Sequence, residues 1–371
     1  MTSGDKQAPP VSRRAFLASA GAIATAGIGL STLQGDRRLI LAGGEDRAGR
    51  FHVLGLSGEN RPVLSLPVSQ RLHGAAQNPV EPSRVVLIAR RPGNLAYELD
   101  LDERRIRRTI RSAPGRHFYG HGEYTADGTC LLTTENAYET GLGKIVVRDA
   151  ADFRIIEELG SGGVGPHDLR LLSDSTTLVV ANGGIRTHPV KHRQKLNLET
   201  MVSSLAYIDL TSGQVIGDFR VPNPALSIRH LRVASNDDVL IAMQYEGDPG
   251  DVVPLVAIHD GVSEIAPFET PRGVAQKMLG YSSEAAFNAD EDIVYLALPR
   301  AGLLARYERA TGSFIDTVSL AQVTSLAADT TDRRAGILVA SKTLGVGRPR
   351  EQSEWPPIAD YRLDDHVILA I

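Results

Sequence analysis

Alternating apolar and polar positions along most of the chain predict many short β-strands and very little helix. Runs rich in β-branched and apolar residues occur at 38–42, 144–147, 205–208 and 292–298, and clusters of Gly, Asn, Asp and Pro bound them. Such boundaries are typical of strands joined by tight turns. The pattern therefore predicts an all-β fold.

A strand–turn–strand unit recurs along this pattern, and in four copies a histidine lies at the start of the first strand. These histidines are followed by a polar turn and a second apolar strand; they are His73, His121, His167 and His230. Two weaker copies carry Glu284 and Ser325 at the corresponding position, so the unit recurs every 41 to 63 residues. A period of about 40–50 residues is typical of four-stranded propeller blades.

The two ends of the repeat region predict how the ring closes. Residues 39–66 hold strands that make most of another blade, and a strand at 366–370 can complete it. Closure removes exposed sheet edges, which otherwise invite aggregation. We therefore expect one β-propeller domain over residues 37–371, with seven blades favoured and six or eight as alternatives. A pair of β-sandwiches is the other architecture, but it would not explain repeats of such similar length.

The longest interval between repeats contains a polar insertion near residues 186–203. It carries His188 and shows few strand signals, which predicts a loop with one helical turn over one end of the ring. Loops on a rigid scaffold often carry function.

The N-terminus resembles a twin-arginine export signal. Arg13 and Arg14 precede Phe16, Leu17 and a weakly hydrophobic stretch rich in Ala and Gly. We expect residues 1–36 to be signal peptide and linker, and the mature protein to lie in the periplasm without stable membrane insertion. Cys130 is the only cysteine, which excludes an internal disulfide, and a net charge of −4 gives no indication of nucleic-acid binding.

Rotational repetition brings equivalent positions together in space, so the four histidines in register are expected to meet at one mouth of the central channel. His188 can reach them from the insertion. Imidazole donors suit iron, copper or zinc. The sequence therefore predicts a transition-metal site whose ligands are His73, His121, His167, His188 and His230.

Three polar residues beside these histidines are candidates for supporting the metal or binding a cofactor. Glu123 lies on the same strand face as His121, and Asp168 follows His167 directly. Either carboxylate can accept a hydrogen bond from a ligating imidazole. Arg229, which precedes the fourth histidine, is a candidate for binding an anionic ligand.

The remaining histidines fit the pattern less well. His117 would lie about 13 Å from His121 in an extended strand, too far to share one metal, so it is a weaker candidate. His52, His259 and His366 fall outside the repeat register, and we expect them at ordinary strand or surface positions.

Several short motifs resemble a family of exported bacterial proteins of unknown function. They lie at residues 117–122, 165–169, 181–189 and 227–231 and at Gln244-Tyr245-x-Gly247. Members have twin-arginine signals and a propeller-like domain, and they are often encoded beside imelysin-like periplasmic iron-uptake proteins and a di-haem peroxidase-like protein. The resemblance implies a role near periplasmic iron handling, with those two kinds of protein as candidate partners, and it implies no particular activity.

The preferred hypothesis is a periplasmic propeller that binds iron or copper through histidines at the channel mouth and is accessory to iron uptake. A metal-dependent, lactonase-like hydrolase is one alternative, in which the metal activates water. Such sites usually mix carboxylates and asparagine, whereas the repeat positions here favour histidine. A non-catalytic interaction scaffold with structural histidines is the other alternative, and whether the protein is an enzyme stays open.

Overall fold

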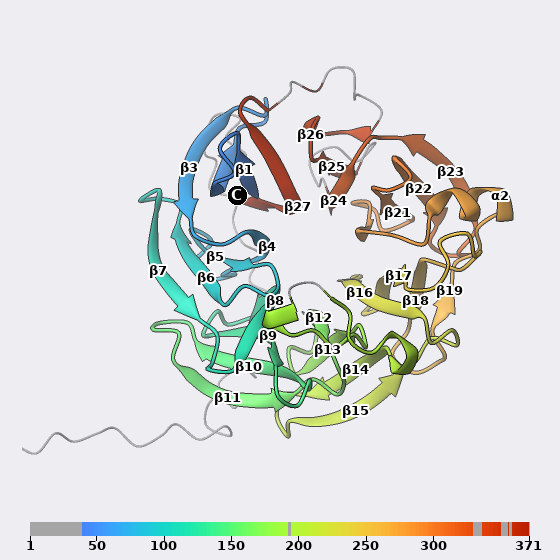
Figure 1. Ribbon diagram of the computed structural model, residues 1–371, viewed down its shortest axis with the longest axis horizontal. Coiled ribbons are helices and arrows are strands. Elements are labelled where there is room, and N and C mark those ends of the chain that lie inside the picture. Colours follow the sequence, from blue (N-terminus) through green and yellow to red (C-terminus); the bar gives the residue numbers. More distant parts are fainter. Residues whose placement is uncertain (1–38, 192–193, 329–335, 350–354, 356–357, 371) are drawn as a thin grey trace, which may run out of the picture.

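Seven antiparallel sheets surround one central axis (Figure 1). The computed structural model describes residues 39–191, 194–328, 336–349, 355 and 358–370. Six sheets have four strands, and the seventh has three within these residues. This confirms the predicted all-β propeller with seven blades. The predicted signal segment, residues 1–36, lies outside the described residues.

Blades 1 to 3 are each built from four consecutive strands. Blade 1 comprises β4 (Leu72–Gln77), β5 (Arg84–Ala89), β6 (Leu95–Asp100) and β7 (Arg105–Arg111). Blade 2 comprises β8 (Arg116–Tyr124), β9 (Cys130–Ala137), β10 (Gly143–Asp149) and β11 (Ile155–Gly160). Blade 3 comprises β12 (Pro166–Leu171), β13 (Thr177–Asn182), β14 (Ser204–Asp209) and β15 (Gln214–Phe219).

Blades 4 to 6 continue the same order around the ring. Blade 4 comprises β16 (Leu226–Val233), β17 (Val239–Tyr245), β18 (Val256–His259) and β19 (Ala266–Pro267), followed by α2 (Arg272–Ala275) and the 3-10 turn η3 (Gln276–Met278). Blade 5 comprises β20 (Glu284–Phe287), β21 (Ile293–Leu298), β22 (Leu303–Glu308) and β23 (Phe314–Ser319). Blade 6 comprises β24 (Val323–Ala328), β25 (Ile337–Ser341) and β26 (Gly345–Gly347).

Blade 7 joins the two ends of the chain. Its innermost strand is β27 (Tyr361–Ala370), which pairs with β1 (Leu39–Asp46), followed outward by β2 (Phe51–Leu56) and β3 (Pro62–Val68). The innermost strands β4, β8, β12, β16, β20, β24 and β27 contact one another in that order around the axis, and β27 contacts β4 to close the ring (Figure 1). The predicted closure by the C-terminal strand is thus confirmed.

Apolar side chains pack between neighbouring blades and leave the axis to polar groups. One continuous cluster joins blades 3, 4 and 5 through Val179, Leu240 and Leu296, all fully buried. Outer strands such as β7 and β15 are mostly exposed. Within the described part of the chain, no helix combines the length and apolar character that a bilayer crossing requires.

The insertion between β13 and β14 forms two short 3-10 turns where one helical turn was predicted. They are η1 (Pro189–Lys191) and η2 (Leu198–Thr200), and residues 192–193 between them lie outside the described residues. The side-chain amide of Asn197 connects the two ends of the loop, because its Oδ1 accepts the N–H of Arg186 and its Nδ2 donates to the carbonyl of Gly184.

Candidate metal centre

Five buried histidines meet inside the channel, and each comes from a different blade. Their side chains lie on β4, β8, β12, β16 and β27, and they are 3–8% exposed; they are His73, His121, His167, His230 and His366. Ring centroids within the cluster lie 4.5–6.2 Å apart. The structure therefore brings together the four histidines that the repeat placed in register. Their role as metal ligands stays a prediction.

His366 is the member that sequence reasoning missed. We expected an ordinary strand or surface position, and that expectation was wrong: its ring centroid lies 4.5 Å from that of His73. In this structure the closing strand β27 is the innermost strand of its blade, so its residues belong in the comparison with the repeat starts. That strand was identified in the sequence, but its histidine was not aligned with the others.

β-Bulges in the innermost strands help to aim these side chains. The strand register shifts across His73 in β4 and across His167 in β12, which leaves both residues outside the ladder. A bulged residue is freed from pairing and its side chain is re-aimed. In β16 the extra residue is Arg229, so the repeat alignment that gave His230 the register of His73 is off by one residue.

Two glycines allow blades 1 and 2 to approach closely enough for the rings of His73 and His121 to meet edge to face, with centroids 4.9 Å apart. Gly120 has φ +111°, and a Cβ there would lie 2.4 Å from Cδ2 of His73. A Cβ at Gly74 would lie 2.5 Å from the carbonyl oxygen of Gly120. The glycine next to the histidine in each strand, Gly74 in β4 and Gly120 in β8, is therefore required for the two strands to pack at the site.

Replacing Gly120 by alanine is expected to lower the free energy of unfolding by about 2–5 kcal/mol. About 1–2 kcal/mol arises from the positive φ, and overpacking against the His73 ring adds about 1–3 kcal/mol. Gly115→Ala is the matched control, because Gly115 has φ +75° but a Cβ there would meet no other atom within 4 Å. Urea unfolding measures both variants, and equal losses would mean that the contact with His73 is not limiting.

Burial keeps the clustered imidazoles neutral. It is the main cause that lowers the pKa of His121 and of His366 to about 3. Burial first, and then the neighbouring charged groups, hold the pKa of His73, His167 and His230 well below 6.5. Neutral imidazole is the form that binds metals, so the cluster is ready to ligate at neutral pH.

Several ring nitrogens in the cluster are buried without a hydrogen-bond partner in the described residues. They are Nδ1 of His73, Nε2 of His121, Nδ1 of His167 and Nδ1 of His230. Buried polar atoms of this kind are uncommon and call for an explanation such as a bound ion.

The spacing of the ring nitrogens fits a metal. Two overlapping triads have potential ligand atoms within 4.8 Å of one another, His73–His121–His366 and His121–His167–His230. Nε2 of His73 and Nε2 of His167 lie 3.4 Å apart. That separation is close to the edge of about 3.3–3.4 Å of a tetrahedron with metal–nitrogen bonds of about 2.0–2.1 Å. His121 belongs to both triads and is the centre of the cluster.

Asp168 lies directly behind two of the rings. Its Oδ1 is 3.5 Å from Nδ1 of His121, and its Oδ2 is 3.9 Å from Nδ1 of His230. The carboxylate is fixed because Oδ2 accepts the backbone N–H of Leu231 and Oδ1 lies 3.1 Å from Nη1 of Arg170. A carboxylate behind an imidazole orients the ring for metal binding. The supporting role that the sequence suggested for Asp168 stays a prediction.

Glu284 supports His366 in the same way, and the sequence gave it no role beyond a repeat position. Its Oε2 lies 3.4 Å from Nδ1 of His366 and accepts the backbone N–H of Leu326, while its other oxygen pairs with Arg232. Asp168 and Glu284 thus each hold a backbone amide of the following blade and face a ring of the cluster. The contacts of Glu284 could have been inferred from the sequence only by aligning blade 5 with blade 3, which places Glu284 in the role of Asp168.

Glu123 and His188 were candidates that the structure does not bring to the rings. Glu123 lies 3.6 Å from Arg170, and burial raises the pKa of its carboxyl to about 7. His188 is half-buried on the insertion, where its ring centroid lies 5.4 Å from that of Tyr138 and its Nδ1 accepts the N–H of Val190. The prediction that His188 reaches into the cluster does not agree with this position.

His117 is held outside the cluster by hydrogen bonds. Its Nδ1 donates to the carbonyl of Phe118 at 2.8 Å, and its Nε2 accepts from the side-chain amide of Asn136 at 3.1 Å. His52 and His259 are likewise hydrogen-bonded strand residues, to Ser65 and to Tyr207 respectively. His52 and His259 therefore lie at ordinary strand positions, as expected.

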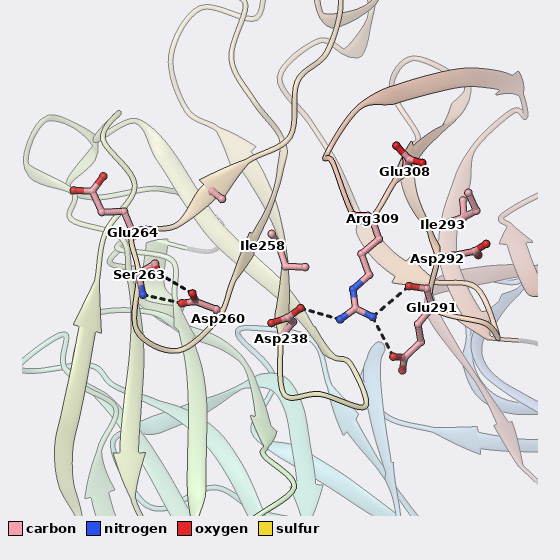
Figure 2. Close-up of a pocket in the computed structure, with 12 residues that line it drawn as sticks. Asp238, Ile258, Asp260, Ser263, Glu264, Glu291, Asp292, Ile293, Glu308 and Arg309 are labelled. Atoms are coloured by element: carbon pink, nitrogen blue, oxygen red, sulfur yellow. Dashed lines mark hydrogen bonds and ion pairs between the residues drawn. The ribbon is translucent and has the colours of Figure 1, made fainter.

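A cavity of about 120 Å³ adjoins the histidines. Arg229, which the sequence nominated for binding an anionic ligand, lines this cavity. A larger cavity of about 560 Å³ lies far from the channel, between the outer parts of blades 4 and 5. Figure 2 shows that Arg309 bridges Asp238 and Glu291 across it. None of its acidic residues joins a group of potential metal ligands within the described residues.

Solved structures share the fold of this chain. Hydrazine synthase of Kuenenia stuttgartiensis aligns with a TM-score of 0.62 and 13% identity, covering 88% of this chain and 99% of that chain. The Cps50 (Swd1) β-propeller domain of Myceliophteria thermophila aligns with a TM-score of 0.52 and 12% identity, covering 78% and 88%. At these identities the likeness shows the fold alone. No curated protein matches the sequence.

A sequence-family model does match the chain. It is described as a protein of unknown function, DUF1513, and it covers residues 66–370, from the end of β3 to the end of β27. The match confirms the expected membership of an uncharacterised family, whereas the export route and the candidate partners stay predictions. On this match, the chain belongs to the DUF1513 family.

Proposed function

We propose that this protein is a periplasmic propeller that binds one transition-metal ion through the histidines of its channel and serves iron uptake. The observation that carries the proposal is the convergence of five buried, neutral imidazoles from five blades. Periplasmic residence is supported by the twin-arginine motif at Arg13 and Arg14. The link to iron is supported by the resemblance to proteins encoded beside iron-uptake genes.

The energetic cost of the cluster favours a bound ion over a purely structural role. Each buried polar atom left without a partner costs about 1–3 kcal/mol. The four unpartnered nitrogens would therefore cost on the order of 4–12 kcal/mol, which is comparable with the whole stability of a typical domain. A metal ion would satisfy one nitrogen of each ring that binds it, Nε2 of His121 among them, and would offset part of this cost.

The donor set indicates which ions are suitable. Imidazoles suit iron, copper and zinc, and the affinity of such a site is highest for copper(II) among the common divalent ions. The single thiol, Cys130, is buried in β9, and burial raises its pKa to about 12, so thiolate ligation is not offered here. We propose iron or copper as the physiological ion and zinc as a useful probe.

Metal analysis of the full mature protein tests the proposal. We expect one copper(II), iron(II) or zinc ion per chain with sub-micromolar affinity, and nitrogen hyperfine structure in the copper spectrum. The triple variant His121→Ala/His167→Ala/His230→Ala should bind none at that affinity. A wild-type protein that binds no transition metal, or a triple variant that binds as tightly as wild type, would reject the site.

The cellular role needs a separate measurement. Loss of the gene should slow growth when iron is scarce, and the wild-type gene should restore growth while the triple histidine variant should not. Restoration by both genes would separate the protein's role in iron uptake from its metal site.

A further inference from the structure

Cationic side chains surround the cavity that adjoins the histidines. Four arginines and one lysine line it, and no carboxylate among the described residues does; the cations are Arg90, Arg91, Lys195, Arg229 and Arg300. Four of the five clustered histidines form the remaining wall on the side of the candidate metal centre. The cavity therefore joins a strongly positive wall to a wall of neutral imidazoles.

Some of these cations are engaged elsewhere. Lys195, from the insertion, pairs with Glu246. Arg300 is exposed and stacks over the ring of Tyr281 at 4.2 Å. These contacts hold two of the positive charges at the rim of the cavity.

Arg91 is different because it is buried and incompletely paired. It is 9% exposed, and its Nη1 has no hydrogen-bond partner in the described residues. Burial, followed by the charge of Arg229, lowers the pKa of Arg91 to about 10. Glu246 acts on Arg91 from a distance, but its carboxylate is ion-paired with Lys195. A buried charge without a close counter-ion is costly, and a bound anion would remove that cost.

We propose that this cavity binds a small oxyanion of the carboxylate or phosphate class, held by Arg91 and Arg229 against the histidine cluster, where it acts as a co-ligand of the metal. The planar guanidinium group binds two oxygens of such anions at once. Since one water occupies about 30 Å³, a cavity of about 120 Å³ suits an anion of a few heavy atoms, such as carbonate, phosphate or acetate.

The two halves of this proposal have different foundations. Anion binding by the arginines depends only on the cavity and its charges. The co-ligand role rests on the proposed metal-binding function. If the oxyanion is a co-ligand of the metal, the bound metal should raise the protein's affinity for the oxyanion, and the bound oxyanion should raise its affinity for the metal by the same factor, because linkage is reciprocal.

Calorimetric titration of the metal-free protein at pH 7 and low ionic strength tests the first half. Phosphate, bicarbonate and acetate are the probes, with chloride for comparison. We expect one saturable oxyanion site, stronger than that for chloride, and an affinity at least about ten-fold lower in Arg91→Gln. Arg306→Gln is the matched control, because Arg306 is a largely buried arginine paired with Asp316 on the outer strands of blade 5, and it should bind like wild type.

Arg229→Gln provides a second variant if Arg91→Gln does not fold, and it should also bind at least about ten-fold more weakly. Wild-type protein without a saturable oxyanion site overturns the proposal, as do folded arginine variants that bind within two-fold of wild type. Tighter binding of phosphate than of acetate, or the reverse, identifies the class of ligand, and both results support the site.

Repeating the titrations with zinc-loaded protein and with the triple histidine variant separates this inference from the proposed function. Oxyanion binding that persists while no metal binds would leave the arginine site standing and remove both the metal function and the co-ligand role. Metal binding without oxyanion binding would overturn the present inference alone. Binding of both without mutual enhancement would overturn the co-ligand role.

Discussion

Replacing His121 by alanine is expected to weaken zinc and copper(II) binding at least about a hundred-fold. His121 is the one ring shared by both triads, and Asp168 orients it from behind. Four-ligand zinc sites bind with about 10–16 kcal/mol, so one imidazole contributes about 3 kcal/mol, which corresponds to roughly a hundred-fold in affinity. Competition titration against a chelator of known affinity measures the change.

His188→Ala is the matched control for this variant. It removes a histidine that the sequence also nominated but that the structure places beside Tyr138 on the insertion. We expect its metal affinity to stay within about three-fold of wild type. Equal losses in the two variants would mean that the insertion moves to contribute a ligand, and equal retention would mean that metal binds outside the cluster.

Acidification from pH 6.5 to 5 is expected to lower the stability of the metal-free protein, by up to about 4 kcal/mol through His121 and His366 alone. The pKa of His121 and of His366 is about 3 in the folded protein, against 6.5 for an unperturbed imidazole. Between these values the unfolded chain binds more protons than the folded one. The stability is therefore complete above pH 6.5 and is lost as the pH falls toward 3. Each group contributes up to about 1.4 kcal/mol per pH unit.

Other groups modify this slope in known directions. The lowered pKa values of His73, His167 and His230 add to the loss. The pKa of Glu123 is raised to about 7, so its folded form keeps a proton that the unfolded chain releases, and it opposes the loss between pH 7 and about 4.5. The lowered pKa values of His117 and His259 add to the loss, whereas the raised pKa values of Glu135 and Asp364 oppose it as that of Glu123 does.

Urea unfolding at several pH values measures the slope. In His366→Asn the dependence should become shallower by about 1.4 kcal/mol per pH unit, whatever the absolute stability of that variant. A flat profile between pH 6.5 and 5 in wild type would contradict the account, and so would an unchanged slope in the variant.

The architecture could be predicted because the sequence repeats one strand–turn–strand unit in each blade. Turn residues and β-branched runs define each strand, and the recurrence of the unit containing His73 and His167 sets the blade length. Ring closure also followed, since the strand near His366 had no partner other than the N-terminal strands. These features depend on local chemistry and on spacing, both of which a single sequence contains.

The site could be predicted only in part, because some of its members are not at repeat positions. His73, His121 and His167 are brought together by pseudo-symmetry alone. Arg91 instead follows β5 in the turn toward β6, and only the three-dimensional path of that turn places it beside Arg229. The path of the insertion likewise decided that His188 lies away from the rings.

Closure of the ring by β27 links the candidate ligand set to the pairing of strands that are far apart in the sequence. His366 comes from the last described strand, while β1, with which β27 pairs, comes from the first described residues. A chain that is truncated before Tyr361 would lose one imidazole and leave the torus open at the same time. An ion held by both His73 and His366 would then act as a clasp between β4 and β27, the two innermost strands that meet where the ring closes.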